Sequence, residues 1–458
     1  MNINKFSVRT LNKYLLFLGF ILIGMCGAIS PLFYLLVPIL CLAMMIRRIN
    51  LKEIMNILFW IIVVTLFLGA YLSVPGYESI YLFRCLIPVH LILLVLTRDI
   101  KWGKLQNYLI YLILLFFCLI SSVISLLWAG STSLGFRYCY FIFEICYLFF
   151  ICFYHLDSKE KMRRLFQVIT VIFSISLVLG VVEIFTGWHL PFSSSLVYVT
   201  TTSEFQPTGF LYNTNDYALM MAILYPIAAS CVFQFKRRYT GIVLYGVLTI
   251  LTLYVVISTY SRIGMLSIGI STLVIFFYRF KQKGVLLLVS LFPLLGIFVW
   301  FSSFGQKLIE IAYAAFNDKG TSTMARNNLY KLLLQIIHDS DFMGVGAGNV
   351  PQKLNALLIG YTDTGTDAYT TGHNFWLETI GNIGLIGFLG FAAIIIIYLI
   401  QLFQSGYLKK SPTPLLIWIT FIGASIALST ILEKRFLWFL LATGICLIQQ
   451  MREGGRET

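Results

Sequence analysis

The chain has 458 residues, of which 59% are hydrophobic and only 11% are charged, and its mean hydropathy is +0.88. This composition excludes a soluble globular protein. The formal net charge is +14, but the basic residues do not gather on one soluble face as they would in a nucleic-acid-binding protein, so no nucleic-acid partner is expected.

Apolar runs long enough to cross a bilayer recur from Tyr14 to Gln449. They predict an all-α, polytopic integral membrane protein with about 12–14 transmembrane helices and one large extracytoplasmic loop. The expected spans lie near residues 14–29, 31–46, 54–74, 80–97, 105–127, 135–154, 165–186, 209–233, 241–258, 263–278, 285–301, 374–402, 413–431 and 436–449.

Most of the 33 Lys and Arg residues fall in every second loop. Because cytoplasmic loops carry an excess of Lys and Arg, this bias places both termini in the cytoplasm and the long polar loop outside. Four parts are expected, which are N-terminal helices in 1–208, central helices in 209–301, the large loop in 302–373, and C-terminal helices with a short tail in 374–458.

Ionisable residues occur within or beside several early spans, namely Arg84, Arg137, Glu144 and Glu183. A charge inside a membrane is costly, so each should face protein or water. Arg137 and Glu144 are seven residues apart and share one helix face. They therefore either form an ion pair that tightens packing, or Arg137 lines a cavity open to the outside.

The segment after Pro207 leads into a membrane helix through Asn213, Asn215 and Asp216. These side chains can cap the free amides of that helix, or the amide-rich edge can bind sugar hydroxyls. Further on, Arg262 violates the positive-inside rule between two spans. It either reaches lipid phosphates or provides a guanidinium fork for a diphosphate, and the second interpretation is preferred.

Within the large loop, apolar residues recur every three or four positions from Thr323 to His338 and predict an amphipathic helix over the bundle, with Arg326 in its first turn. The glycine-rich stretch Gly344–Asn349 predicts a flexible turn that permits backbone close to a ligand, although it lacks the Rossmann spacing. The loop's Asp and His residues fit no metal-ligand pattern, so no metal is expected.

His373 and Asn374 stand directly before an apolar run that continues to Ile400. A titratable imidazole at the mouth of a membrane helix is suited to proton transfer on a lipid-borne substrate. Glu378, five residues on, is a candidate to orient His373 or to bind sugar.

Taken together in their order, several of these features resemble the O-antigen ligase and polysaccharide polymerase superfamily over roughly residues 205–400. The features are Thr208-Gly209, Asn213 with Asn215, Ser261-Arg262, Arg326, the Gly344–Asn349 stretch, His373-Asn374, and Gly384 with Gly387. The resemblance implies a GT-C-like membrane glycosyltransferase of a bacterial cell membrane, with its active site outside and no cofactor or metal. It carries one His and two Arg roles to His373, Arg262 and Arg326.

The implied reaction moves glycan from a polyprenyl-diphosphate carrier, such as undecaprenyl diphosphate, to a hydroxyl of an acceptor glycan. The two arginines stabilise the leaving diphosphate and a neutral His373 takes the acceptor proton, with inversion at the anomeric carbon. Arg137, Asn213, Asn215, Asn374 and Glu378 are candidates for sugar binding or support.

We expect a polymerase of a capsule, exopolysaccharide, teichuronic acid or O-antigen type of polysaccharide, in contact with the lipid bilayer and other polysaccharide-assembly membrane proteins. One alternative is a ligase that moves finished glycan to lipid A core or protein. Another is a glycan flippase or transporter, which would place its ionisable residues near mid-membrane and often shows repeats.

Overall fold

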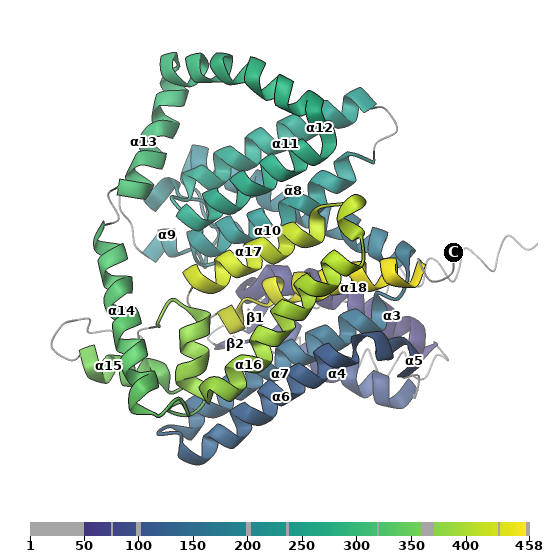
Figure 1. The fold of residues 1–458 in the computed structure, drawn as a ribbon, viewed down its shortest axis with the longest axis vertical. Coiled ribbons are helices and arrows are strands. Elements are labelled where there is room, and N and C mark those ends of the chain that lie inside the picture. The colour runs from purple at the N-terminus through teal and green to yellow at the C-terminus, as the bar shows by residue number, and fades with distance from the viewer. Residues whose placement is uncertain are drawn as a thin grey trace, which may run out of the picture.

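The computed structural model describes residues 50–74, 77–97, 102–197, 203–234, 238–317, 320–358, 371–428 and 431–454. Long helices packed side by side form most of this part of the chain (Figure 1). They are α3 (Leu51–Leu68), α4 (Leu82–Thr97), α6 (Leu109–Ile124), α7 (Thr132–His155), α8 (Lys159–Thr186), α10 (Thr214–Val232), α11 (Arg238–Ser258), α12 (Arg262–Phe301), α16 (Phe375–Gln404), α17 (Thr413–Ala427) and α18 (Arg435–Gly454).

Within the described part of the chain, eight helical stretches are long and apolar enough to cross a membrane, and two shorter apolar helices, α4 and α17, accompany them. Each expected span from residue 54 onward contains a helix. The expected spans 14–29 and 31–46 lie outside the described residues. The prediction of an all-α polytopic membrane protein is therefore confirmed. A small antiparallel hairpin of β1 (Ser73–Val74) and β2 (Tyr77–Tyr81) precedes α4.

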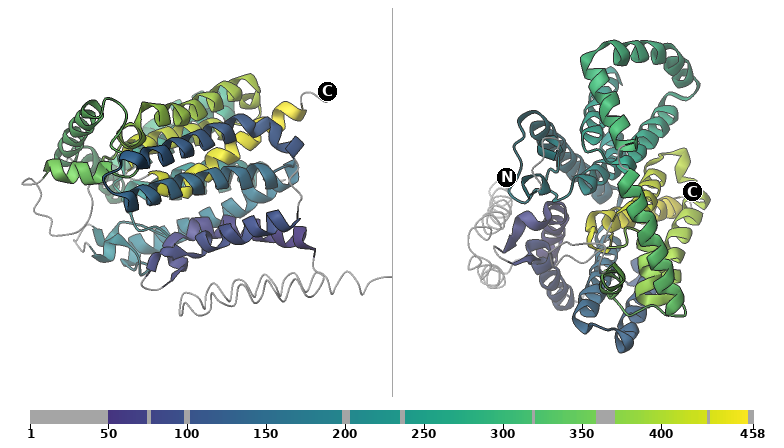
Figure 2. Two further views of the ribbon diagram at one scale, coloured as in Figure 1. Left: turned by 90° about the horizontal axis from the view of Figure 1, so that it is seen from below. Right: turned by 90° about the vertical axis from the view of Figure 1, so that its left-hand side faces the viewer.

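The helices run along one common axis, which gives the bundle two ends (Figure 2). We call the end where α16 begins the His373 end, and the other the opposite end. The starts of α4, α7, α10, α12 and α18 also lie at the His373 end, while α3, α8, α11 and α17 start at the opposite end. Basic residues in and beside the connections between helices lie at the opposite end, among them Lys104, Lys161 in the first turn of α8, and Lys410.

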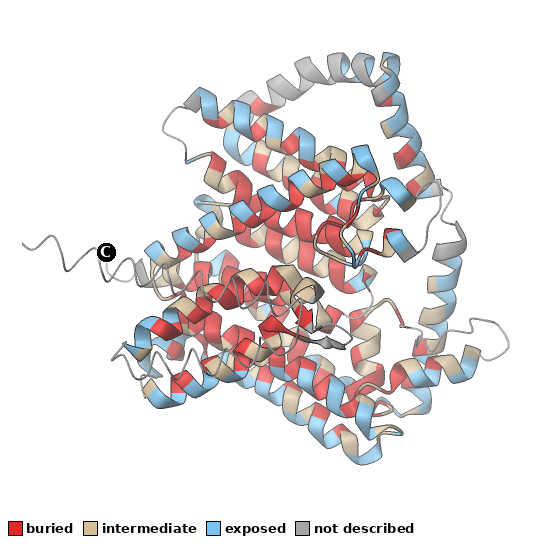
Figure 3. Ribbon diagram, turned by 180° about the vertical axis from the view of Figure 1, so that it is seen from behind, coloured by how far each residue is buried: buried red, intermediate tan, exposed pale blue. Residues whose placement is uncertain are grey.

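The centre of the bundle is formed by α10 and α18, whose residues are almost all buried (Figure 3). α10 packs against α8, α11, α12, α17 and α18. Near the His373 end of α18, Trp438 is 1% exposed and lies against the rings of Phe375, Phe391 and Phe421. This aromatic cluster fixes the starts of α16 and α18 relative to the end of α17.

The segment between the α12 helix and α16 covers the His373 end (Figure 1). Lys281 breaks the helical dihedral angles of α12 with φ 50°, and the chain turns back after it. The segment continues through α13 (Ser303–Asn317), α14 (Gly320–Asp339) and α15 (Val350–Leu358). α14 confirms the predicted amphipathic helix, because Leu333 and Ile336 are buried against α15 and Leu377.

The glycine-rich stretch Gly344–Asn349 is fixed to the bundle by close packing. Gly346 has φ +95°, and a Cβ there would lie 2.5 Å from the Cα of Ala129. Gly348 has φ +71°, and its Cβ would lie 2.4 Å from the carbonyl oxygen of Leu134. The Asn349 side chain accepts a hydrogen bond from the Ser131 amide at 2.7 Å. The glycines therefore permit contact with the corner between α6 and α7 and with the first turn of α7, and the prediction of a flexible turn close to a ligand was wrong on this point.

The same stretch also completes a break in α16. At Gly384 the helix leaves helical geometry with φ 75° and ψ 176°. The Val345 amide donates to the Gly381 carbonyl at 2.7 Å, and the Leu385 amide donates to the Phe342 carbonyl at 2.9 Å. The loop thus satisfies backbone groups that the break would otherwise leave unpaired in a buried place.

Candidate active site

The turn before α16 holds His373 in a left-handed conformation, with φ +52°. A non-glycine residue in this region is uncommon and needs support from its surroundings. Asn374 supplies part of that support as the N-cap of α16, because its side chain accepts from the amides of Trp376 and Leu377. The Glu378 carboxylate accepts a hydrogen bond from the Gly372 amide and so holds the other side of the turn. This contact supports the turn that holds His373, and the two expected roles of Glu378, orienting the imidazole or binding sugar, stay predictions.

Arg326 reaches the same turn from α14. The Tyr330 hydroxyl, one helical turn further on, donates to the carbonyl oxygens of His373 at 3.3 Å and Ile426 at 3.2 Å, which fixes α14 to the turn and to the end of α17. Burial lowers the pKa of His373 below its usual 6.5, and the nearby positive charge of Arg326 lowers it further. The imidazole is therefore mostly neutral at pH 7, the form that can accept a proton.

A cavity of about 430 Å³ adjoins the turn, between α7, α16 and the short segment Ile431–Glu433. Thr371 and Phe375 line it on either side of His373, and Glu378 lines it from α16. Arg137 lines it from α7, so the prediction that Arg137 faces a cavity is confirmed. The prediction that the cavity opens to the outside of the cell stays a prediction.

Arg137 does not pair with Glu144, so the expected ion pair between them was wrong. Glu144 is 1% exposed and binds two arginines from other helices, Arg84 at 2.9 Å and Arg435 at 2.9 Å. Arg137 instead contacts Glu433 at 3.3 Å. Residues seven apart share a helix face only approximately, and here Glu144 faces the core while Arg137 faces the cavity.

Three consecutive charged residues at the start of α18 connect different parts of this end. Glu433 pairs with Arg137 at the cavity. Lys434 forms an ion pair with the buried Asp216 of α10. Arg435 binds Glu144 of α7 and also donates to the Glu433 carbonyl at 3.2 Å. The segment therefore joins α7 and α10 to the cavity wall.

Arg262 lies at the start of α12, immediately after a corner in which Tyr260 has φ +55°. The next residue, Ile263, packs against Gly423 near the end of α17. On α16, Trp376 donates to Ser425 of the same helix end at 2.8 Å. Arg262 and the His373 turn therefore flank the end of α17, and the structure brings them to the same end of the bundle.

The amide-rich edge before α10 has a structural role. Asn213 caps α10 by accepting from the Asn215 amide at 2.7 Å. Upstream, the amides of Thr208 and Gly209 donate to the buried Glu183 carboxylate at 2.8 and 2.9 Å. These contacts account for the Thr208-Gly209 pair and for Asn213 without a ligand, so sugar binding by Asn213 and Asn215 stays a prediction.

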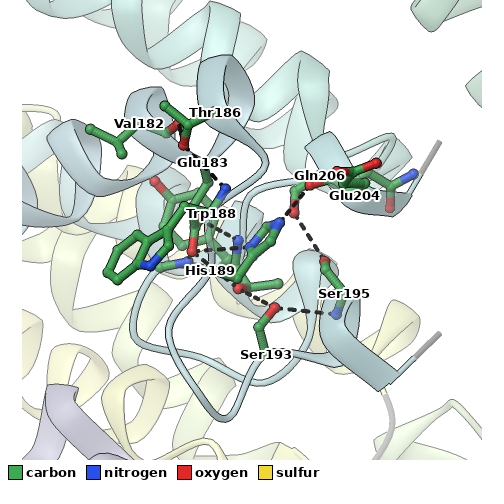
Figure 4. A network of polar contacts seen from close by, with 12 residues as sticks. Val182, Glu183, Thr186, Trp188, His189, Ser193, Ser195, Glu204 and Gln206 are labelled. Carbon is green, nitrogen blue, oxygen red and sulfur yellow. Dashed lines mark hydrogen bonds and ion pairs between the residues drawn. The ribbon is translucent and has the colours of Figure 1, made fainter. Parts of the chain in front are cut away.

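Glu183 is also the centre of a buried polar network that holds the polar stretch before α10 (Figure 4). His189 lies 3.3 Å from its carboxylate and also contacts the Glu204 carbonyl at 2.6 Å. Burial alone would lower the pKa of His189, but these two acceptors raise it overall above 6.5. With an acceptor facing each ring nitrogen, the network favours the imidazolium form.

Within the described ranges, no group of three or more His, Cys, Asp or Glu side chains has the arrangement of a metal site. The candidate residues at the turn are instead an imidazole, a guanidinium and a carboxylate. This set can move one proton and stabilise negative charge, as acyl- or glycosyl-transfer sites do.

Residues 247–392 match the O-antigen ligase family. This part of the chain is therefore similar to the O-antigen ligase family. The chain is also similar to the teichuronic acid biosynthesis protein TuaE of Bacillus subtilis (strain 168), with 24% identity over 434 residues that cover 87% of this chain and 85% of the relative. The matched O-antigen ligase region contains Arg262, Arg326, His373 and Glu378, whereas Arg137 lies before it.

Sequence reasoning missed the charged segment at the start of α18. Glu433, Lys434 and Arg435 lie between the expected spans 413–431 and 436–449. The two basic residues depart from the positive-inside rule there, as Arg262 does. The partners of all three residues lie 218 to 296 residues away in the chain. The signal was present, but only the fold shows which residues they bind.

Proposed function

We propose that this protein is a polymerase of a cell-surface polysaccharide that uses glycan carried on a polyprenyl diphosphate. Similarity of residues 247–392 to the O-antigen ligase family supports glycan transfer, and the name of the similar protein TuaE supports a polymer of the cell envelope. The observation that carries the proposal is geometric: Tyr330 of α14 bonds to the His373 carbonyl, which brings Arg326, one helical turn earlier, to a supported turn at the mouth of a membrane helix.

The proposed step forms one bond and breaks one. The acceptor hydroxyl oxygen attacks the anomeric carbon of the donor, and the bond from that carbon to the diphosphate oxygen breaks. The electron pair leaves with the diphosphate, whose charge Arg326 and Arg262 stabilise. His373 takes the hydroxyl proton as general base. Attack opposite the leaving group inverts the anomeric centre, and this scheme uses no metal.

The proposed site faces the outside of the cell. This assignment is supported by the basic loops at the opposite end of the bundle, which the positive-inside rule places in the cytoplasm. Arg137, Arg262 and Arg326 at the His373 end are then exceptions to that rule. Exceptions of this kind are expected where positive charge serves a phosphate-bearing substrate.

The test uses purified protein, a synthetic polyprenyl-diphosphate glycan and added EDTA. His373→Ala should lower the transfer rate by roughly 10²–10⁴-fold while donor binding changes little. His338→Ala is the matched control, because His338 ends α14 with a side chain that is 86% exposed. Transfer that survives His373→Ala would end the base assignment, and transfer abolished by EDTA would show that a metal takes part.

A second pair of variants tests the diphosphate role. Arg262→Lys keeps the charge but loses the fork geometry, so transfer should fall by about tenfold to hundredfold while the protein still accumulates in membranes. Arg163→Lys, exposed at the opposite end, should leave transfer unchanged. Equal activity of both variants would remove Arg262 from the site. The products also separate polymerase from ligase, since a polymerase gives a ladder and a ligase adds one glycan to each acceptor.

A further inference from the structure

The cavity beside the His373 turn has the lining of a ligand site rather than of a packing defect. Its volume is about 430 Å³, within the range of small-molecule sites. Aromatic rings and aliphatic side chains form its walls, and polar groups converge on it from three elements. The lining residues used below are Leu134, Arg137, Phe141, Thr371, Phe375, Glu378 and Glu433.

The charges in the lining argue against two parts of the donor as ligands of this cavity, the diphosphate and the isoprenoid tail. One guanidinium, that of Arg137, faces two carboxyl groups, those of Glu378 and Glu433, and Arg137 already contacts Glu433 at 3.3 Å. The lining therefore supplies no net positive charge for a diphosphate or an acidic sugar. A long isoprenoid tail is also a poor fit, because it would displace water from these charged groups without offering them any hydrogen bond.

A neutral sugar fits both kinds of surface. The ring faces of a pyranose carry C–H groups that pack on aromatic rings such as Phe141 and Phe375. Its hydroxyl groups can donate to the carboxylates of Glu378 and Glu433 and accept from Arg137 or Thr371. Aromatic walls with a few converging polar groups are typical of sites that fix the orientation of a small ligand.

The cavity is also within reach of the proposed base. Thr371 and Phe375 line it and stand two residues to either side of His373, which is itself outside the lining. Two residues of chain span at most about 7 Å. A glycan seated in the cavity can therefore extend its terminal hydroxyl past the edge of the turn to the imidazole, while Arg326 approaches from α14.

We propose that this cavity is the subsite for the acceptor glycan and that it selects neutral sugars, an inference that rests on the proposed glycan transfer. Donor and acceptor then occupy different surfaces. The diphosphate is held by guanidinium groups of α12 and α14, and the acceptor lies between α7, α16 and the segment before α18.

The test fills the cavity from α7. Leu134→Trp places a large ring in the lining. Phe136→Trp introduces the same residue two positions on, at a side chain that is 66% exposed and outside the lining. The probe is the lipid-free repeat-unit oligosaccharide released by mild acid from the cell's own polysaccharide. Its binding to the purified full-length protein is followed by saturation-transfer NMR, which needs no turnover.

Leu134→Trp should abolish oligosaccharide binding and raise the KM for acceptor by tenfold or more, with the KM for donor unchanged and Phe136→Trp like wild type. Glu433→Gln is a second, smaller change to the lining and keeps the test informative if Leu134→Trp misfolds. Loss of one charged hydrogen bond should weaken oligosaccharide binding about tenfold. Unchanged oligosaccharide binding in both Leu134→Trp and Glu433→Gln would overturn the inference. It would also be overturned if these variants bound polyprenyl phosphate more weakly than wild type but bound the oligosaccharide normally. If transfer is never observed but the oligosaccharide binds in a Leu134→Trp-sensitive way, the subsite stands and the proposed function fails.

Discussion

Removal of the Glu144 side chain is the perturbation whose cost the structure defines best. Glu144 is 1% exposed, and the side chains of its partners Arg84 and Arg435 are 17% and 12% exposed. Both guanidinium groups also approach the ring of Tyr81, at 4.7 and 4.8 Å. Glu144→Ala therefore leaves two mostly buried positive charges near one ring, without the carboxylate that separates them.

Breaking a buried ion pair by removing one partner costs about 3–5 kcal/mol. The attraction of each arginine for the Tyr81 ring persists in the variant, so we expect the lower part of that range. Glu433→Ala is the matched control, because it removes a carboxylate whose pair is much more exposed, at 33% for Glu433 and 64% for Arg137. Exposed pairs of that kind contribute about 0–1 kcal/mol.

The assay is thermal unfolding of the purified protein in detergent, followed by a thiol-reactive dye that reports exposure of the buried cysteines. Glu144→Ala should lower Tm by roughly 5–10 °C and Glu433→Ala by about 2 °C or less. A double-mutant cycle of Glu144→Ala with Arg435→Ala should show a clear coupling energy. Equal Tm shifts for the two single Glu variants would refute the claim that the buried contact of Glu144 with two arginines stabilises the fold more than the exposed Glu433 pair does.

Three further outcomes are expected. The acid limb of the pH–rate profile should lie below pH 6.5. Arg326→Ala should move this limb to higher pH, because removing a positive charge raises the pKa of His373. An unmoved limb would show that Arg326 does not act on the imidazole. The raised pKa of His189 means that its contact with Glu183 stabilises the fold fully below the unfolded-state pKa near 6.5 and loses that contribution as pH rises through the raised value. Tm should therefore fall from pH 6 to pH 8.5, and this fall should be smaller in His189→Gln, with an equal fall contradicting the assignment. A cysteine at Leu357, which is 42% exposed on α15, should react with an impermeant maleimide in intact cells, and labelling only after permeabilisation would reverse the proposed orientation.

The sequence allowed prediction of the parts of this fold that depend on local pattern. Apolar runs located the helices, and the spacing of Leu329, Leu333 and Ile336 located the amphipathic helix that carries Arg326. The position of His373 directly before a helix could also be predicted from the sequence. Each of these features depends on neighbouring residues only, which is why a single sequence was enough.

Pairings between distant segments could not be predicted in the same way. Glu144 binds Arg84 and Arg435, which lie 60 and 291 residues away, while the nearer Arg137 faces elsewhere. For the Gly344–Asn349 stretch, the residues that need the glycines are Ala129, in the corner between α6 and α7, and Leu134 of α7, both far upstream. A run of glycines predicts close approach, but it does not say whether a ligand or another helix approaches.

The fit of this glycine stretch limits how the loop can be exchanged between relatives. A chimera that imports residues 302–373 from a similar protein also imports the backbone shape of that loop. This backbone must pass Ala129 at the position of Gly346, where there is no room for a Cβ atom. Its Asn349 equivalent must in addition find an amide where Ser131 lies. Functional hybrids should therefore require the α6–α7 corner and the loop to be transplanted as a unit, even though more than 200 residues separate them in the gene.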